Sequence, residues 1–363
     1  MTTDPVHVGT GGMRLGRVDN TIVREPGTKL PKIPGTALHG AIRAYAARRY
    51  GKPQCAGQGS KEGRRHCGQP TCPICYTFGS IQGEARSFSG VVTITDARIL
   101  LFPVYSMVGP VWVTSPDALR DAGFNGDYSV SDDKAKWSGL TDGNFLNLGW
   151  LMLEKEGSWP PPDDLKDKLP EPVKNRIVLV SPTLFSQIVN SNLEVRTSVA
   201  INPETGAAEE GALFTYEAIP RATFLWFDVV VDDFRKSLPT TERLENWEEI
   251  LNRGSEDKKK ELLKKWKLWA EKDGDKKLDD AVKKATKWIE GEKFQNDNGD
   301  KEWKWEKMKC KGVEAEEKNQ KHDEKAILCI MESGLEWAEH LGIGGMGTRG
   351  FGRIKKICEP WEV

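Results

Sequence analysis

Residues 6–46 constrain the fold most, because they pass from a short strand through a glycine-rich loop into a helix. Residues 6–8 are mostly apolar, and three glycines follow between positions 9 and 12. Glycine has no Cβ, so it lets a backbone turn sharply and approach a ligand closely. Beyond a proline-framed turn, apolar residues recur at helical spacing after Thr36, a candidate N-cap. A basic loop that faces a helix N-terminus can hold an anionic backbone.

The charge distribution supports an anionic partner at this end of the chain. The 363 residues carry a net charge of -1, but residues 1–75 hold 12 Lys and Arg against 4 Asp and Glu, a net of +8. Such a concentration of positive charge can attract nucleic acid although the whole chain is nearly neutral. The sequence shows no apolar signal segment and no run of about 18 apolar residues, so we expect a cytoplasmic protein without a membrane partner.

Four of the seven cysteines cluster between residues 55 and 75 with the spacing Cx11Cx4CxxC. Thiolates at these positions can close a tetrahedral zinc shell on a polar loop that would not fold alone. Four sulfur ligands leave no open position, so the spacing predicts structural zinc; His66 could replace one thiolate. Free cysteines on a flexible insert and a thioredoxin-type CxxC are the weaker alternatives. The predicted ligands are Cys55, Cys67, Cys72 and Cys75.

The middle of the chain predicts strands and then a projecting hairpin. Residues 88–114 read as two strands rich in β-branched and aromatic side chains. Residues 193–219 alternate in character around the turn-forming segment NPETGAAEEG, which predicts a long β-arm. Such an arm has little core of its own, so it would contact a neighbour or a nucleic acid; an ordinary surface hairpin is an equal alternative. Residues 117–170 suggest no function.

Residues 241–325 form a segment of different composition. They contain 23 Lys and Arg, 23 Asp and Glu, and six tryptophans. Apolar residues three and four apart, with mixed charges between them, predict amphipathic helices. We expect a solvated helical insertion packed by its tryptophans.

The C-terminal end predicts a helix over 326–341, followed by a glycine-rich loop and a short strand. Gly342, Gly344 and Gly347 fit the pattern GxGxxG. A dinucleotide site is disfavoured, because that fingerprint follows a strand and opens a helix. The loop can instead offer main-chain amides to phosphates, beside two arginines.

Several of these segments carry a family resemblance. They are HVGTG at 7–11, VDNTIVRE at 18–25, LPKIPGTALHGAIR at 30–43, CPICYTFGS at 72–80, and the glycine loop after residue 341. Together they resemble the RAMP superfamily, and more narrowly the backbone subunit of type III CRISPR effector complexes. Segments near residues 95–98 and 195–214 favour the Cmr type, whereas the cysteine cluster is more typical of the Csm type.

The resemblance implies an α+β fold: a modified ferredoxin-like (RRM-like, RAMP) core with three additions. The core would occupy 1–231 and be completed by 326–363. The additions would be a zinc-binding insertion at 51–80, the β-hairpin arm at 193–219, and the charged helical insertion at 241–325.

The resemblance also implies a function. The chain would bind CRISPR guide RNA, stack head to tail with copies of itself, associate with other type III effector subunits, and cleave complementary target RNA at regular intervals. Asp19 matches the position of the family's catalytic aspartate, beside a loosely bound Mg²⁺ or Mn²⁺. His7 could assist proton transfer, and Glu217 is a weaker candidate. The implied RNA-binding residues are Arg14, Arg17, Arg24, Thr36, His39, Arg43, Gly345, Gly347, Arg349 and Arg353.

Two other readings stay open. In the first, the chain is a non-catalytic RNA-binding scaffold subunit of the same complex. In the second, it is an unrelated zinc-containing nucleic-acid-binding protein such as a regulator, which would prefer duplex DNA; no helix with spaced base-reading side chains supports that reading.

Overall fold

A computed structural model of the chain describes residues 1–11, 18–57, 66–81, 87–208, 213–296, 299–304 and 320–359. Its contacts divide the chain into two compact units. Unit 1 comprises Met1–Leu38, Ile94–Asp228 and Glu336–Val363, and unit 2 comprises His39–Thr93 and Val229–Leu335.

Unit 1 is built around a ferredoxin-like sheet. Strand β3 (Ala97–Val104) pairs antiparallel with β11 (Phe224–Trp226), and the segment just before β11 pairs with the N-terminal segment through Val6 and Ile219. The N-terminal segment in turn pairs with the C-terminal one through Thr2 and Ile354. The terminal segments form isolated bridges rather than full strands, and with them the members of this core lie in the order fourth, first, third, second along the chain, with all neighbours antiparallel. Helix α1 (Gly35–Arg49) connects the first two strands and α10 (Gln320–Leu341) the last two, so the predicted ferredoxin-like core is confirmed.

The sheet of unit 1 continues beyond this core, which the sequence did not predict. From β3 it runs through β4 (Val111–Thr114), β8 (Ile177–Val180), β5 (Lys134–Trp137), β7 (Leu151–Gly157) and β6 (Phe145–Leu148). Helix α6 (Pro182–Ser191) covers one face, where Phe102, Trp137 and Phe185 are fully buried. Apolar side chains of α3 (Pro116–Asp121), α4 (Asp163–Asp167) and α5 (Glu171–Lys174) belong to a second buried cluster with Leu100 and Leu101. A short β1 (Lys32–Ile33) also pairs with β3.

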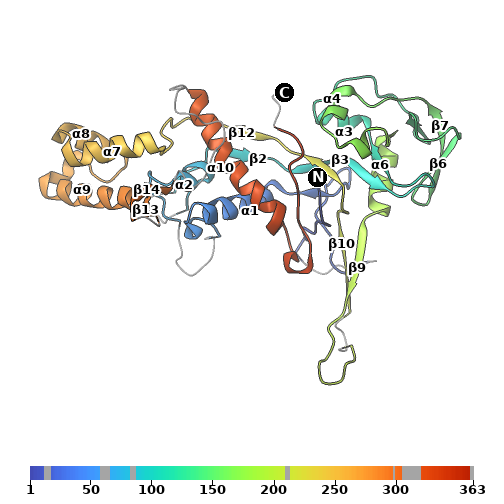
Figure 1. Ribbon diagram of the computed structural model, residues 1–363, viewed down its shortest axis with the longest axis horizontal. Coiled ribbons are helices and arrows are strands. Elements are labelled where there is room, and N and C mark those ends of the chain that lie inside the picture. The colour runs from blue at the N-terminus through green and yellow to red at the C-terminus, as the bar shows by residue number, and fades with distance from the viewer. Residues whose placement is uncertain are drawn as a thin grey trace. The chain divides into compact units, whose positions relative to one another are not determined.

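The predicted β-arm is confirmed. Strands β9 (Glu194–Ser198) and β10 (Phe214–Ala218) pair antiparallel, and a further bridge joins Ile201 to Ala208 nearer the tip. Figure 1 shows the arm projecting away from the rest of unit 1. Among the described residues of the arm, those at its base are buried, where Tyr216 and Ala218 pack on Phe351.

Unit 2 combines the cysteine loop with the helical insertion. The loop holds a 3-10 turn at Pro53–Cys55 and helix α2 (Pro73–Phe78). The predicted helices are confirmed as α7 (Thr241–Arg253), α8 (Glu256–Lys265) and α9 (Gly274–Glu290), and tryptophans are buried among them. Helix α8 ends at Lys265, and two residues later Lys267 adopts a left-handed backbone with φ 54°. Two short pairs complete the unit: β2 (Val92–Ile94) with β12 (Val229–Val231), and β13 (Lys293–Gln295) with β14 (Lys301–Trp303).

A buried carboxylate joins the two parts of unit 2. Glu292, which follows α9, is fully buried. It forms an ion pair with Lys52 and accepts hydrogen bonds from the hydroxyls of Tyr50 at 2.9 Å and Thr71 at 3.4 Å. Since a buried charge is costly unless it is paired and hydrogen-bonded, this cluster fixes the insertion against the start of the cysteine loop. Among the described helices, none is long and apolar enough to cross a membrane.

Candidate active site and metal centre

Asp19 is held in place by the arm. Its Oδ2 accepts hydrogen bonds from the backbone nitrogen of Thr215 at 2.7 Å and from the Thr215 hydroxyl at 2.9 Å. The same hydroxyl accepts a hydrogen bond from the Asp19 backbone nitrogen at 3.1 Å. No described residue donates a hydrogen bond to the other carboxylate oxygen. The bonds from the Thr215 backbone, and then from its hydroxyl, hold the pKa of Asp19 below its ordinary value of 3.8, so Asp19 is ionised at neutral pH.

Glu217 lies two residues further along β10, on the same side of the strand as Thr215. One of its carboxylate oxygens accepts a hydrogen bond from the Ile22 backbone nitrogen at 2.8 Å. Both oxygens also bind the Arg24 guanidinium, which donates in addition to Asn190 at 2.9 Å. The Glu217 carboxylate is buried in these bonds. Glu217 and Arg24 therefore fix the segment that follows Asp19 to the arm.

His7 lies under the glycine-rich loop with a defined tautomer. Its Nδ1 is 2.6 Å from the carbonyl oxygen of Glu217, and because a carbonyl can only accept, Nδ1 carries the proton. In the neutral ring Nε2 is consequently an acceptor. A Cβ built at Gly9 would lie 3.0 Å from that Nε2, and one at Gly345 would lie 3.6 Å from the adjoining ring carbon. Because Gly9 and Gly345 have no side chain, the space beside Nε2 of the buried His7 is not filled by either residue.

The C-terminal glycine loop closes on the same segment. The Gly345 nitrogen donates to the His7 carbonyl oxygen at 2.9 Å. At Gly344, with φ 89°, a Cβ would lie 2.5 Å from that carbonyl, so only glycine fits there. Gly347 and Arg349 form an exposed 3-10 turn, and the Arg349 guanidinium lies 5.8 Å from the ring centre of Phe214 on the arm.

The remaining predicted RNA-binding residues lie in several environments. Arg14 and Arg17 lie outside the described residues. Arg353 forms an ion pair with Asp4, and Thr36 is exposed in the first turn of α1. His39 is half-buried with its ring edge-to-face against Phe78; burial, and then the charge of Arg43, lower the pKa of its imidazole.

The four predicted cysteine ligands converge in unit 2. Their sulfur atoms all lie within 4.8 Å of one another. The Sγ–Sγ distances are 3.5 Å for Cys55–Cys67, 3.9 Å for Cys55–Cys72 and 3.7 Å for Cys67–Cys75. Zn–S bonds in tetrahedral geometry place sulfurs about 3.8 Å apart, so the four residues fit a metal such as zinc. Three of them are buried, which suits a structural site.

Two residues beside this cluster carry other predictions: Arg43 is predicted to bind RNA, and His66 to be a possible replacement for one thiolate. Arg43 is buried and donates to the carbonyl oxygens of Cys55, Phe78 and Gly79. Its guanidinium also lies 2.9 Å from Nδ1 of His66, which accepts from the Ile81 nitrogen at 3.1 Å as well. His66 is accordingly used inside the loop, and the group of metal-ligating atoms consists of the four thiolates without it.

The site in unit 1 thus brings together five of the predicted residues, which are joined through β10 or the N-terminal segment: Asp19, His7, Arg24, Gly345 and Glu217. Sequence reasoning missed Thr215, the residue that holds Asp19. A threonine is an ordinary residue in a strand, so nothing in the local sequence marks Thr215 as part of a site. Its contact with Asp19 spans 196 residues, which no local pattern can predict.

The family model of the RAMP superfamily matches residues 1–355. The CRISPR system Cmr endoribonuclease Cmr4 of Pyrococcus furiosus is 28% identical over 254 residues, 63% of this chain and 79% of that protein. The Cms endoribonuclease Csm3 of Mycobacterium tuberculosis is 44% identical over 46 residues, 13% of this chain and 20% of that protein.

Similar solved structures include the apo type III-B Cmr-beta complex and oligomeric Cmr4 from Pyrococcus furiosus. The first matches with 17% identity and a TM-score of 0.48, over 65% of this chain and 83% of that one. The second matches with 21% identity and a TM-score of 0.43, over 68% and 84%. Because the family model spans nearly the whole chain, the protein belongs to the RAMP superfamily, with Cmr4 and Csm3 among its homologues.

Proposed function

We propose that the protein is a backbone subunit of a type III CRISPR effector complex. The subunit would bind guide RNA and cleave the complementary target RNA, with Asp19 as its catalytic carboxylate. The observation that supports this most is the state of Asp19: one carboxylate oxygen is fixed by Thr215 and the other receives no hydrogen bond from a described residue. The homology to proteins named endoribonucleases points the same way.

The chemistry needs few groups. The 2′-oxygen of the target RNA attacks the adjacent phosphorus, the bond to the 5′-oxygen breaks, and the products are a 2′,3′-cyclic phosphate and a 5′-hydroxyl. The 2′-hydroxyl proton must leave, and Nε2 of His7, beside Gly9, can accept it, while water supplies the proton that the departing 5′-oxygen takes up. A hard divalent cation such as Mg²⁺ or Mn²⁺ suits the carboxylate oxygen of Asp19 that Thr215 does not hold, together with a phosphate, and would supply charge stabilisation when bound.

The RNA would be contacted by exposed groups of unit 1. Arg349 is exposed beside Phe214. The guanidinium suits a phosphate, and the neighbouring ring suits a base of the same RNA strand. Gly345 and Gly347 are exposed on the same loop. Arg24 and Arg353 already hold carboxylates, so we assign them to positioning the loops rather than to direct contact.

Cleavage by the assembled complex tests the proposal. Wild type, Asp19→Ala and the control Asp142→Ala, an exposed aspartate on another loop, are each assembled with guide RNA and given labelled complementary RNA and Mg²⁺. We expect regularly spaced cuts with wild type and the control, and none with Asp19→Ala, although that variant still binds the target. Equal cutting by Asp19→Ala would place the chemistry elsewhere, and tight binding without cutting by wild type would make the protein a scaffold.

We also propose that copies of the chain stack head to tail, because unit 1 exposes two separate apolar surfaces. One, the sheet-edge surface, lies on the turn after β3 and on the β6–β7 hairpin, at the end of the sheet. Its exposed side chains are Tyr105, Met107, Phe145, Trp150 and Met152.

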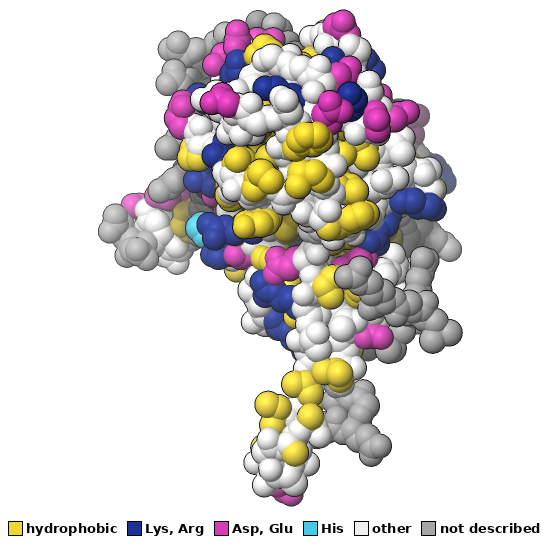
Figure 2. Space-filling view, turned by 90° about the vertical axis from the view of Figure 1, so that its right-hand side faces the viewer, with side chains coloured by type: hydrophobic (Ala, Val, Ile, Leu, Met, Phe, Trp, Pro, Cys, Tyr) yellow, Lys and Arg dark blue, Asp and Glu magenta, His cyan; other side chains and the backbone are white. Residues whose placement is uncertain are grey.

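The other, the arm surface, consists of Val195, Val199, Ile201 and Leu213. Figure 2 shows hydrophobic side chains gathered on the face of the molecule and again along the arm. Two different apolar surfaces on one chain suit a heterologous contact, which repeats into a filament.

A further inference from the structure

The helical insertion of unit 2 contains a cavity of about 750 Å³, within the range of ligand sites. Its lining comes from the segment before α7, from α7 itself, and from α8. Nothing in the Asp19 chemistry uses this part of the chain, and the insertion as a whole is electrically neutral.

The charges around the cavity are unequal. Its lining includes five cationic side chains and two carboxylates, Glu249 and Glu261. The cations are Lys236, Arg243, Arg253, Lys258 and Lys265. Among the described residues no carboxylate pairs with Lys258 or Lys265, whereas Lys260 and Lys264 on the same helix are paired with Glu256 and Glu271. Lys258 and Lys265 thus bring two ammonium groups without a carboxylate partner among the described residues to the lining of the cavity, which favours an anionic ligand.

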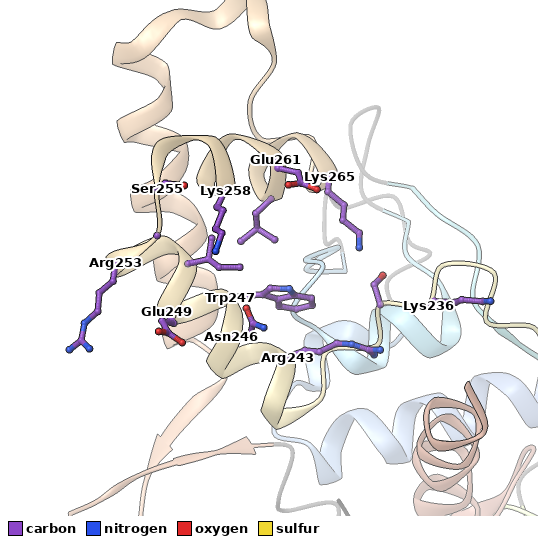
Figure 3. A pocket seen from close by; sticks show the side chains of 14 residues that line it. Lys236, Arg243, Asn246, Trp247, Glu249, Arg253, Ser255, Lys258, Glu261 and Lys265 are labelled. Carbon is purple, nitrogen blue, oxygen red and sulfur yellow. The ribbon is translucent and has the colours of Figure 1, made fainter. Parts of the chain in front are cut away.

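The same cavity offers an aromatic surface. Trp247 on α7 is half-buried, and its ring meets the buried Trp266 edge-to-face at 5.2 Å. Figure 3 shows the indole of Trp247 in the middle of the cavity, with the side chains of Lys258 and Lys265 reaching down from α8 on either side of it. Ser255 also lines the cavity, and its hydroxyl makes no capping hydrogen bond to α8, so it can donate to an oxygen of a ligand.

We propose that this cavity is a second RNA-binding site that takes one nucleotide of a single strand, with its base against Trp247 and its phosphate between Lys258 and Lys265. A π-surface flanked by ammonium groups is the combination that binds single-stranded nucleic acid without regard to sequence. That the strand is RNA rests on the proposed function; the cavity itself selects a stacked base and a phosphate. In the effector complex the site would hold RNA outside the path over unit 1.

Ultraviolet crosslinking of the full-length protein to a uridine oligomer, with mass-spectrometric mapping of the peptides, tests the inference. We expect crosslinks to the peptide that contains Trp247. The double variant Lys258→Glu/Lys265→Glu should reduce their yield about tenfold or more, since two phosphate contacts become repulsive. The control Lys283→Glu/Lys287→Glu changes the net charge equally on exposed positions of α9 outside the cavity, and should leave the yield within about twofold.

The outcomes separate this site from the path over unit 1. Crosslinks at Trp247 without crosslinks near Arg349 would support the cavity and contradict the proposed RNA path. Crosslinks near Arg349 alone, or an equal loss in both double variants, would overturn the cavity as a site.

A binding comparison between single-stranded and duplex RNA checks the stacking contact. Trp247→Leu keeps an apolar side chain against the core of the insertion but removes the ring. It should weaken binding of the single strand about tenfold and leave duplex binding unchanged, because only the single strand offers an unstacked base. An equal effect on both RNAs would contradict a base on Trp247.

Discussion

Thr215 donates two hydrogen bonds to the same carboxylate oxygen of Asp19, from its backbone nitrogen at 2.7 Å and from its hydroxyl at 2.9 Å. The two residues lie 196 positions apart, one after the N-terminal glycine loop and the other on the arm. The arm therefore does more than project from the sheet: its base orients the carboxylate to which we assign catalysis.

Thr215→Val tests this relationship. The variant loses the hydroxyl, and with it one bond to Asp19 Oδ2 and the acceptor for the Asp19 nitrogen. We expect target cleavage to slow about tenfold because the carboxylate is less well oriented, with target binding retained. Thr197→Val, at the position directly opposite on β9, is the matched control and should cleave like wild type. Identical rates for all three proteins would remove Thr215 from the site.

The pH dependence of Asp19 follows from the same bonds. They lower its pKa below 3.8, so their contribution to stability is present above that ordinary value and is lost as the pH falls through the lowered one. A carboxyl ¹³C titration of Asp19 should give a midpoint below 3.8 in wild type and a higher one in Thr215→Val. Cleavage should not decline between pH 7 and about pH 5 through protonation of Asp19; a midpoint above 3.8 would contradict the hydrogen-bond geometry.

Removal of one cysteine ligand should release the metal and loosen unit 2. Metal analysis of the purified protein should find about one zinc per chain, and Cys75→Ser should lose it. Because the metal orders a polar loop, the variant should be cleaved faster by protease between residues 51 and 80. Cys358→Ser, a free cysteine in unit 1, is the control and should retain zinc. Full zinc occupancy in Cys75→Ser would show that the four thiolates are not the ligand set.

Glu292→Gln should destabilise unit 2 strongly. Lys52 would remain buried without its carboxylate, and breaking a buried pair from one side costs about 3–5 kcal/mol. Chemical unfolding would measure the loss, and Glu290→Gln, an exposed carboxylate two residues earlier, should change stability by less than about 0.5 kcal/mol. If both variants unfold alike, the cluster does not anchor the insertion.

Trp150→Glu should weaken assembly between copies. The substitution places a charge on the sheet-edge surface, where Trp150 is 72% exposed, so the isolated subunit should keep its fold. Light scattering at several concentrations should show a shift from oligomer to monomer. Leu341→Glu, on an exposed position at the end of α10, is the control and should assemble normally. Unchanged assembly of Trp150→Glu would exclude this surface from the contact between copies.

Some features of this protein follow from the sequence alone. The cysteine spacing predicted the four sulfurs that converge, because closely spaced ligands on one loop need little tertiary information. The composition of 241–325 predicted helices, since periodicity is local. The family resemblance indicated the ferredoxin-like core and singled out Asp19.

Tertiary structure decided the rest, because the contacts involved join residues far apart in the chain. The extension of the sheet through β8 and β5 combines parallel and antiparallel neighbours, and no local pattern in residues 117–170 specifies that order. Arg24 and Arg43 look alike in sequence as basic residues near a glycine loop. In the structure Arg24 holds Glu217 and Arg43 holds the carbonyls of the cysteine loop. A guanidinium that is shielded from solvent, partly at Arg24 and almost fully at Arg43, must satisfy its donors wherever the fold supplies acceptors. Asp19 likewise depends on a contact between distant residues. The sequence indicates the carboxylate, but Thr215 on the arm, 196 residues away, decides which of its two oxygens is held.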